Sequence, residues 1–89
     1  MKGIITVLGK DKVGIIAKVC LFLSENGINI LDISQTIVQG YLNMVMIVDL
    51  SGSKAPFDEI YAGLKKVEEE IGAQILLQRE DIFDSMHRI

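Results

Sequence analysis

The sequence predicts a small α+β domain in which helices cover one face of a four-stranded antiparallel β-sheet. Its 89 residues are enough for one domain with a single two-layer core. Short segments rich in β-branched residues alternate along the chain with two segments of helical periodicity. With 49% hydrophobic and 24% charged residues, the composition is typical of a globular protein.

A polar loop separates the first predicted strand from the first predicted helix. Residues 3–8 are apolar on both faces and are bounded by Gly3 and Gly9, which predicts a central strand. After the loop 9–14, Asp11 is a candidate N-cap, and Gly27 is suited to end the helix in a left-handed conformation. The apolar stripe of this helix consists of Ile15, Ile16, Val19, Cys20, Phe22 and Leu23.

The middle of the chain predicts a β-hairpin. Residues 28–38 and 42–50 have β character, and Gln39-Gly40 marks the turn between them. The apolar phase of the first strand reverses near Leu31-Asp32, which a β-bulge or a late strand start explains. In the second strand Met44 and Met46 are spaced for one face, and we interpret them as core residues.

The second half predicts a helix, a strand and a short terminal helix. Pro56 suits a first helical turn, Gly72 ends the helix, and residues 73–78 form the last strand. Asp81 is suited to cap a helix in the extension 81–89, after a domain spanning residues 3–80. The apolar positions of the long helix are Phe57, Ile60, Tyr61, Leu64, Val67 and Ile71.

The order β-α-β-β-α-β is that of the ferredoxin-like sandwich, with both helices on one sheet face. The other face is then bare, although residues 3–8 and 42–50 carry large aliphatic side chains on both faces. Leaving such a face in water is unfavourable, so we expect a cover. The candidates are a second subunit, which predicts an oligomer, and the terminal helix with Ile82, Met86 and Ile89.

Two segments resemble the ACT domain, a regulatory module that commonly binds amino acids. Residues 8–16 read Leu-Gly-Lys-Asp-Lys-Val-Gly-Ile-Ile, and residues 26–30 read Asn-Gly-Ile-Asn-Ile. The resemblance covers roughly residues 3–80, and the loop is similar to that of sensor-type members such as the glycine-cleavage repressor. Residues 80–89 also resemble the ending of small standalone ACT proteins. Two positions depart from the pattern, since Lys12 replaces a common Arg and Val13 replaces a common Pro that would stiffen the loop.

The resemblance implies a non-catalytic module that binds an amino acid or a similar metabolite at a subunit interface. A helix N-terminus suits the ligand's carboxylate, and Gly14 allows close approach to the backbone. Asp11 is an acceptor for the ammonium group, and Asn29 matches a family position that often reaches in from a neighbouring subunit. The predicted ligand-binding residues are Gly9, Asp11, Lys12, Val13, Gly14, Ile15 and Asn29.

Each of these residues also has a structural interpretation, which the sequence leaves open. Gly9 and Gly14 suit turn geometry, Asp11 suits an N-cap, and Asn29 suits the turn after Gly27. A second function is open too, in which the apolar surfaces serve only to bind another copy or a regulated protein partner. In that case no ligand is bound.

Composition argues against several other functions. The net charge of -3 and the absence of aromatics in residues 3–8 argue against nucleic-acid binding. The single Cys20, interpreted as a buried apolar residue, and the single His87 do not provide a metal site or a catalytic triad, so we expect no cofactor, no metal and no enzymatic activity. Neither a leader nor a membrane-spanning run is evident, which predicts a cytoplasmic protein.

Overall fold

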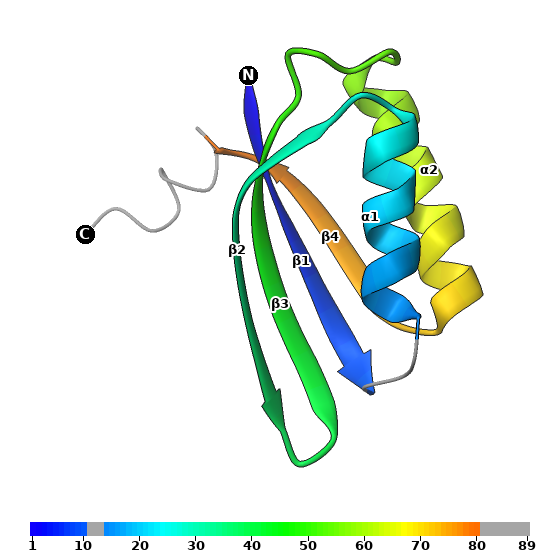
Figure 1. Cartoon of the computed structure of the whole chain (residues 1–89). Coiled ribbons are helices and arrows are strands. Elements are labelled where there is room, and N and C mark those ends of the chain that lie inside the picture. The colour runs from blue at the N-terminus through cyan, green and yellow to red at the C-terminus, as the bar shows by residue number, and fades with distance from the viewer. Residues whose placement is uncertain (11–13, 81–89) are drawn as a thin grey trace.

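The computed structural model describes residues 1–10 and 14–80 of the chain as two layers, a four-stranded sheet and a pair of helices (Figure 1). The predicted loop residues 11–13 and the predicted terminal helix at 81–89 lie outside the described residues. In chain order the elements are β1 (Lys2–Lys10), α1 (Ile15–Glu25), β2 (Asn29–Val38), β3 (Tyr41–Asp49), α2 (Phe57–Ile71) and β4 (Gln74–Arg79).

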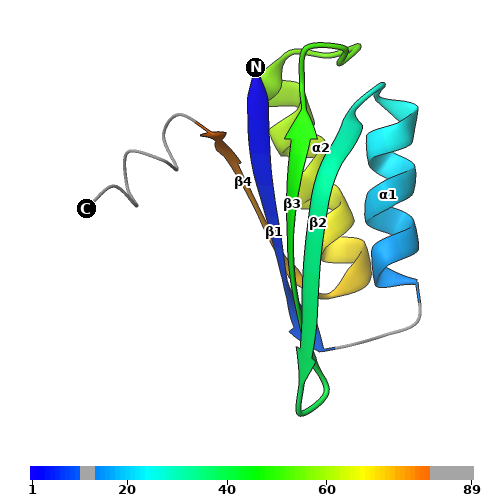
Figure 2. The same cartoon turned by 60° about the vertical axis from the view of Figure 1, so that its left-hand side comes forward.

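The sheet has the order β2-β3-β1-β4, and every neighbouring pair is antiparallel. Figure 2 shows both helices on the same side of this sheet. The ferredoxin-like prediction is therefore confirmed, including the central position of β1. The strand extends from Lys2 to Lys10, beyond the predicted residues 3–8, because it pairs with β3 along its whole length.

The core lies between the sheet and the two helices. Every second residue of β3 points into it, including Met44 and Met46, both 0% exposed, as the sequence predicts. In the described part of the chain no polar or charged residue is buried. Among the described residues, the core between sheet and helices therefore consists of apolar side chains alone. The most deeply buried side chains are Ile5, Val7, Val19, Leu23, Leu42, Met44, Met46, Val48, Ile60, Leu64 and Ile75.

The predicted hairpin and its bulge are both present. Gln39 and Gly40 have φ angles of 51° and 81°, which is the left-handed geometry of a two-residue hairpin turn. The register of β2 against β3 shifts between Ile30 and Asp32. Because of this shift, Ile30 and Ile33 face the same side of the sheet despite their odd spacing.

Helix α1 starts at Ile15, directly after Gly14, which has a φ of 94°. The N-cap position therefore belongs to Gly14, and the prediction of Asp11 as the N-cap is wrong; a glycine has no side chain with which to cap. At the other end Gly27 has the predicted left-handed φ, 72°. Cys20 is half-buried rather than buried, because it lies at the edge of the apolar stripe.

Helix α2 starts at Phe57, so Pro56 is the N-cap rather than part of the first turn. Gly72 ends the helix with a φ of 69°, as predicted. Tyr61, which the spacing places on the apolar stripe, is 39% exposed. The buried face of α2 is narrower than predicted; its buried residues are Ile60, Leu64, Val67 and Ile71.

The helix-free face of the sheet carries apolar side chains in its centre. Leu8, Val45 and Leu76 are 47%, 37% and 47% exposed, whereas Ile4 on the same face is 5% exposed. Polar residues of β2, namely Asp32, Ser34 and Thr36, continue this face toward its edge. The predicted apolar surface on the second face is thus present over β1, β3 and β4.

Candidate functional site

The start of α1 is the part of the predicted site that the structure describes best. Gly14 adopts the left-handed conformation, and a Cβ atom placed there would meet no described atom within 4 Å. No side chain of the described residues caps this helix end, and the first turn holds no acidic residue. The backbone N–H groups of the first turn therefore receive no carboxylate from the helix itself, which suits an anionic ligand group.

Ile15 belongs to the core rather than to a binding surface. Its side chain is 2% exposed and packs in the cluster between helix and sheet. Any contact from Ile15 to a ligand has to come from its main chain. Asp11, Lys12 and Val13, the other predicted residues of this loop, lie outside the described residues.

Gly9 has a packing role that the sequence leaves undecided. A Cβ atom on Gly9 would lie 2.7 Å from the Cβ atom of Ala73, closer than two carbon atoms approach. Gly9 therefore allows β1 to lie against the chain that leads into β4. This contact is sufficient reason for a glycine at position 9, whether or not a ligand binds there.

Asn29 lies at the opposite end of the sheet from Gly14. It begins β2 and is paired with Asp49 at the end of β3, whereas Gly14 follows the end of β1. The 11 residues of α1 separate the two ends by about 16 Å. A single chain does not bring Gly14 and Asn29 together.

Asn29 and Cys20 line a shallow depression between α1 and β2, together with Gly27 and Ile30. Beside it, the Ser51 hydroxyl and the Ser51 backbone N–H donate to the Asp49 carboxylate at 2.6 and 3.0 Å. These two hydrogen bonds lower the pKa of Asp49 below its ordinary value. An ionised carboxylate thus lies across from Asn29.

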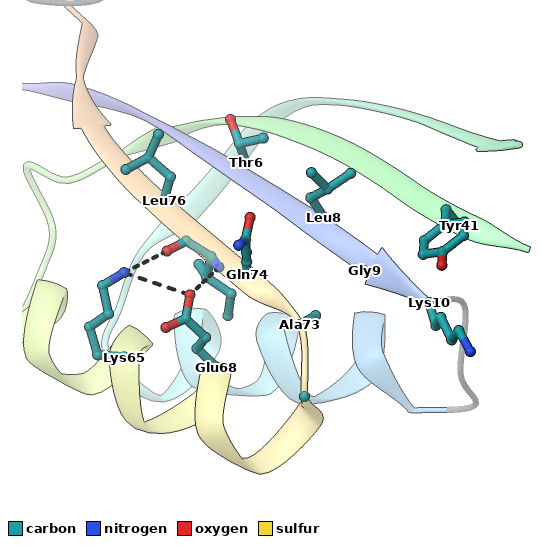
Figure 3. A pocket seen from close by; sticks show the side chains of 12 residues that line it. Thr6, Leu8, Gly9, Lys10, Tyr41, Lys65, Glu68, Ala73, Gln74 and Leu76 are labelled. Atoms are coloured by element: carbon teal, nitrogen blue, oxygen red, sulfur yellow. Dashed lines mark hydrogen bonds and ion pairs between the residues drawn. The ribbon is translucent and has the colours of Figure 1, made fainter.

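A larger concavity lies where β1 and β4 meet α2 (Figure 3). Leu8 and Leu76 point from the sheet toward the helix-free side, and Lys10 and Tyr41 lie at one end. On the other side Lys65 and Glu68 reach from α2 to β4. Lys10 and Tyr41 are register partners and mark the end of the sheet at which Gly14 follows.

Lys65 and Glu68 are two residues that sequence reasoning missed. Their spacing predicts only local charge pairs on a solvated helix face. In the structure Lys65 Nζ donates to the Ile75 carbonyl at 3.1 Å, and the Ile75 N–H donates to Glu68 Oε2 at 2.7 Å. No sequence signal identifies them, because their partners are backbone atoms of a different element.

The sequence of this chain, with this fold and with Gly14 before α1, was compared with models of known families. The model described as ACT domain matches residues 3–78. The chain belongs to the ACT domain family. ACT domains are typically regulatory modules that bind small ligands. The prediction made from residues 8–16 and 26–30 is therefore confirmed at the level of the family.

Individual ACT and related proteins support this membership over nearly the whole chain. A UPF0237 protein of Clostridium acetobutylicum is 54% identical over 89 residues, covering 100% of both chains. The solved structure of an ACT domain protein from Streptococcus pneumoniae is 39% identical, with a TM-score of 0.81, over 94% of each chain. The regulatory subunit of aspartate kinase from Thermus thermophilus, in a ligand-free form, is 30% identical with a TM-score of 0.66, over 86% of this chain and 50% of that one.

Neither a metal-binding cluster nor a membrane-spanning helix is found among residues 1–10 and 14–80 of this ACT domain. No group of three or more His, Cys, Asp or Glu side chains is arranged to hold a metal ion there. Within the same residues, neither helix has the length and apolar character needed to cross a bilayer.

Proposed function

We propose that this ACT domain is a non-catalytic regulatory module, spanning residues 3–80, that binds an amino acid or a similar small metabolite between two subunits. The predicted site consists of the loop from Gly9 to Ile15 in one subunit and Asn29 of the other. The observation that carries the proposal is the distance between Gly14 and Asn29 within one chain. The two residues lie at opposite ends of the sheet, so a site containing both needs two chains.

A two-fold pairing of β2 strands is the arrangement that supports such a site. β1 and β2 run in the same direction, so β2 ends at the same end of the sheet at which β1 leads into Gly14. If the β2 strands of two copies pair antiparallel, the partner's Asn29 is carried to that end. The exposed apolar residues of β2, which are Leu31, Ile33, Ile37 and Val38, are consistent with an edge that another chain covers.

Thermal unfolding in the presence of each of the twenty amino acids tests the proposal. A ligand that binds only the folded state stabilises it by about 2.7 kcal/mol at a concentration one hundred times its Kd. We expect at least one amino acid to raise the melting temperature. The Gly14→Val variant should lose this rise, because its side chain would occupy the open space beside the first turn of α1.

Gly40→Val is the matched control for Gly14→Val. Gly40 also has a positive φ, 81°, and a Cβ atom there would likewise meet no described atom within 4 Å. The two variants therefore carry the same kind of backbone strain. A shift lost in Gly14→Val and kept in Gly40→Val supports the site; a shift kept in both shows that the loop is not the binding site.

The second candidate function is assembly without a ligand. The exposed apolar side chains on the helix-free face and on β2 favour it, because such surfaces commonly bind protein. This function predicts no thermal shift with any amino acid. An assay with an acyl phosphate tests the non-catalytic part of the proposal, and turnover would contradict it.

A further inference from the structure

The helix-free face of the sheet carries one continuous apolar patch, formed by Leu8, Val45 and Leu76. Thr6 lies at its centre, because the register places Val45 on one side of Thr6 and Leu76 on the other. Leu8 lies two residues further along β1 and therefore on the same face. The exposed fractions of Leu8, Val45 and Leu76 are 47%, 37% and 47%, so each side chain of the patch is partly in contact with water.

The helices cannot cover the apolar patch, because they lie on the other side of the sheet (Figure 2). On that side they pack over Ile5 and Val7, the neighbours of Thr6 in β1, and both of these side chains are 0% exposed. The space between sheet and helices is thus filled. A further segment that packs on the sheet has to lie on the helix-free face.

Burial on the helix-free face increases toward the end of the sheet at which β4 stops. Ile4 shares this face with Leu8 but is only 5% exposed, and it does not belong to the apolar cluster between sheet and helices. Arg79, the last residue of β4, is paired with Gly3, directly beside Ile4. The chain therefore leaves the sheet at the end of the face where burial begins.

The residues that follow have the side chains that an apolar face requires. Residues 81–89 read Asp-Ile-Phe-Asp-Ser-Met-His-Arg-Ile. Their apolar positions are spaced to share one side, with polar residues between them. Leaving both this stripe and the apolar patch in water is unfavourable, and one contact between them removes both from water. The apolar residues of the segment are Ile82, Phe83, Met86 and Ile89.

The length of this segment suits the distance that it has to cover. Ile4 and Leu8 are four residues apart along β1, which corresponds to about 14 Å. The nine residues 81–89 span about 14 Å in a helix and more when they are extended. In either conformation the segment can reach from the end of β4 across the whole apolar patch.

We propose that residues 81–89 fold back over the helix-free face of their own chain and cover the apolar patch with Phe83 and Met86. The occupant belongs to the same chain because attachment through Glu80 gives it an effective concentration on the order of millimolar. The docked segment occupies a surface that would otherwise bind protein, so it limits assembly through this face. This arrangement is independent of the proposed ligand site, because it uses neither the loop 9–15 nor Asn29.

Methyl NMR spectroscopy of the full chain tests the contact. The aromatic ring of Phe83 should displace the methyl resonances of the apolar patch, and Phe83→Leu should remove this displacement. Phe57→Leu is the matched control, because Phe57 packs against the core from the helix side. It should move methyl resonances of the core and leave those of the patch in place. Patch resonances that do not change in Phe83→Leu would overturn the proposal.

A mixture of isotope-labelled and unlabelled chains shows whose segment covers the face. We expect nuclear Overhauser effects between the Phe83 ring and the Val45 methyl groups within one chain and none between chains. Effects between chains would show that the segment is exchanged with a second copy, which overturns the intrachain arrangement. Their absence both within and between chains would overturn the contact itself.

Binding of the apolar dye anilinonaphthalene sulfonate tests whether the segment closes the face. Phe83→Asp/Met86→Asp should displace the segment and raise the dye fluorescence, because a carboxylate is unfavourable against an apolar surface. Ser85→Asp/His87→Asp adds the same number of carboxylates at polar positions of the segment and should leave the fluorescence low. Equal fluorescence of the two variants would contradict the closed face.

The outcomes also separate this inference from the proposed function. An amino acid that raises the melting temperature equally in the unmodified chain and in Phe83→Asp/Met86→Asp supports the ligand site and leaves the dye result to decide about the segment. A closed face in a chain that responds to no amino acid contradicts ligand binding alone. An open face in a chain that does respond contradicts the docked segment alone.

Discussion

Gly9 lies so close to Ala73 that a side chain at residue 9 has no room: its Cβ atom would lie 2.7 Å from the Ala73 Cβ atom and 3.0 Å from the Ala73 Cα atom. This contact joins the end of β1 to the turn before β4. Gly14 differs in this respect, because a Cβ atom there would meet no described atom within 4 Å. Of the two glycines in this predicted loop, Gly9 is needed for close packing, whereas Gly14 is needed for its positive φ.

Gly9→Ala should destabilise the fold by about 1–3 kcal/mol, because a methyl group is forced into an occupied position. Urea denaturation measures the change. The double variant Gly9→Ala/Ala73→Gly should recover part of the loss, since it removes the methyl group of Ala73 that the new side chain would strike. Additive effects of the two substitutions would contradict the contact.

Truncating two neighbouring residues of β4 to alanine should lower the free energy of unfolding by very different amounts. The side chain of Ile75 is 2% exposed and faces the core, so Ile75→Ala should cost about 2–5 kcal/mol. Leu76 is 47% exposed on the helix-free face, so Leu76→Ala should cost no more than about 1 kcal/mol. Equal losses in urea denaturation would contradict the assignment of the two faces.

Proline substitutions in β2 test the direction of its backbone groups. The N–H and C=O of Ile75 bond side chains of α2, so they point outward from the sheet. Following the register from Ile75 through its partners in β1 and β3 to Gln35, the backbone groups of Gln35 point outward as well. Gln35→Pro removes an N–H that points outward, which an edge strand tolerates. Thr36→Pro removes an N–H that points toward β3 and should cost at least about 1 kcal/mol more, because a ladder hydrogen bond is lost. Thermal unfolding of the two variants at low concentration gives the comparison, and the reverse order would contradict the assignment.

Ser51→Ala should raise the pKa of Asp49, because the Ser51 hydroxyl contributes most to lowering it. A folded-state pKa below the unfolded value means that the stabilisation is present above the unfolded pKa and is lost as pH falls through the folded pKa. Ser51→Ala should therefore weaken the loss of stability in acid. An NMR titration of the Asp49 carboxyl checks the shift.

Ser53→Ala is the control for this titration. The Ser53 hydroxyl donates to the Ala55 carbonyl at 2.7 Å and not to Asp49. Its removal should leave the pKa of Asp49 where it is in the unmodified chain. An equal shift in both variants would mean that the Ser51 hydroxyl is not the cause.

Local patterns in the sequence determined the elements of this protein and the ends of most of them. The periodicities of 2 and 3.6 residues identify the strands and helices. Gly27 and Gly72 take left-handed conformations at helix ends, and the local sequence is enough to predict this. The loop before α1 also identified the ACT family. These features depend on residues near one another in the chain, so a sequence displays them directly.

Only the tertiary structure decided which residues meet across elements. Gly9 against Ala73, and Glu68 and Lys65 on Ile75, are contacts between segments that packing brings together. The separation of Gly14 from Asn29 is of the same kind, because it depends on how α1 spans the sheet. Such relationships follow from the positions of strands and helices in space, and neither periodicity nor spacing along the chain encodes them.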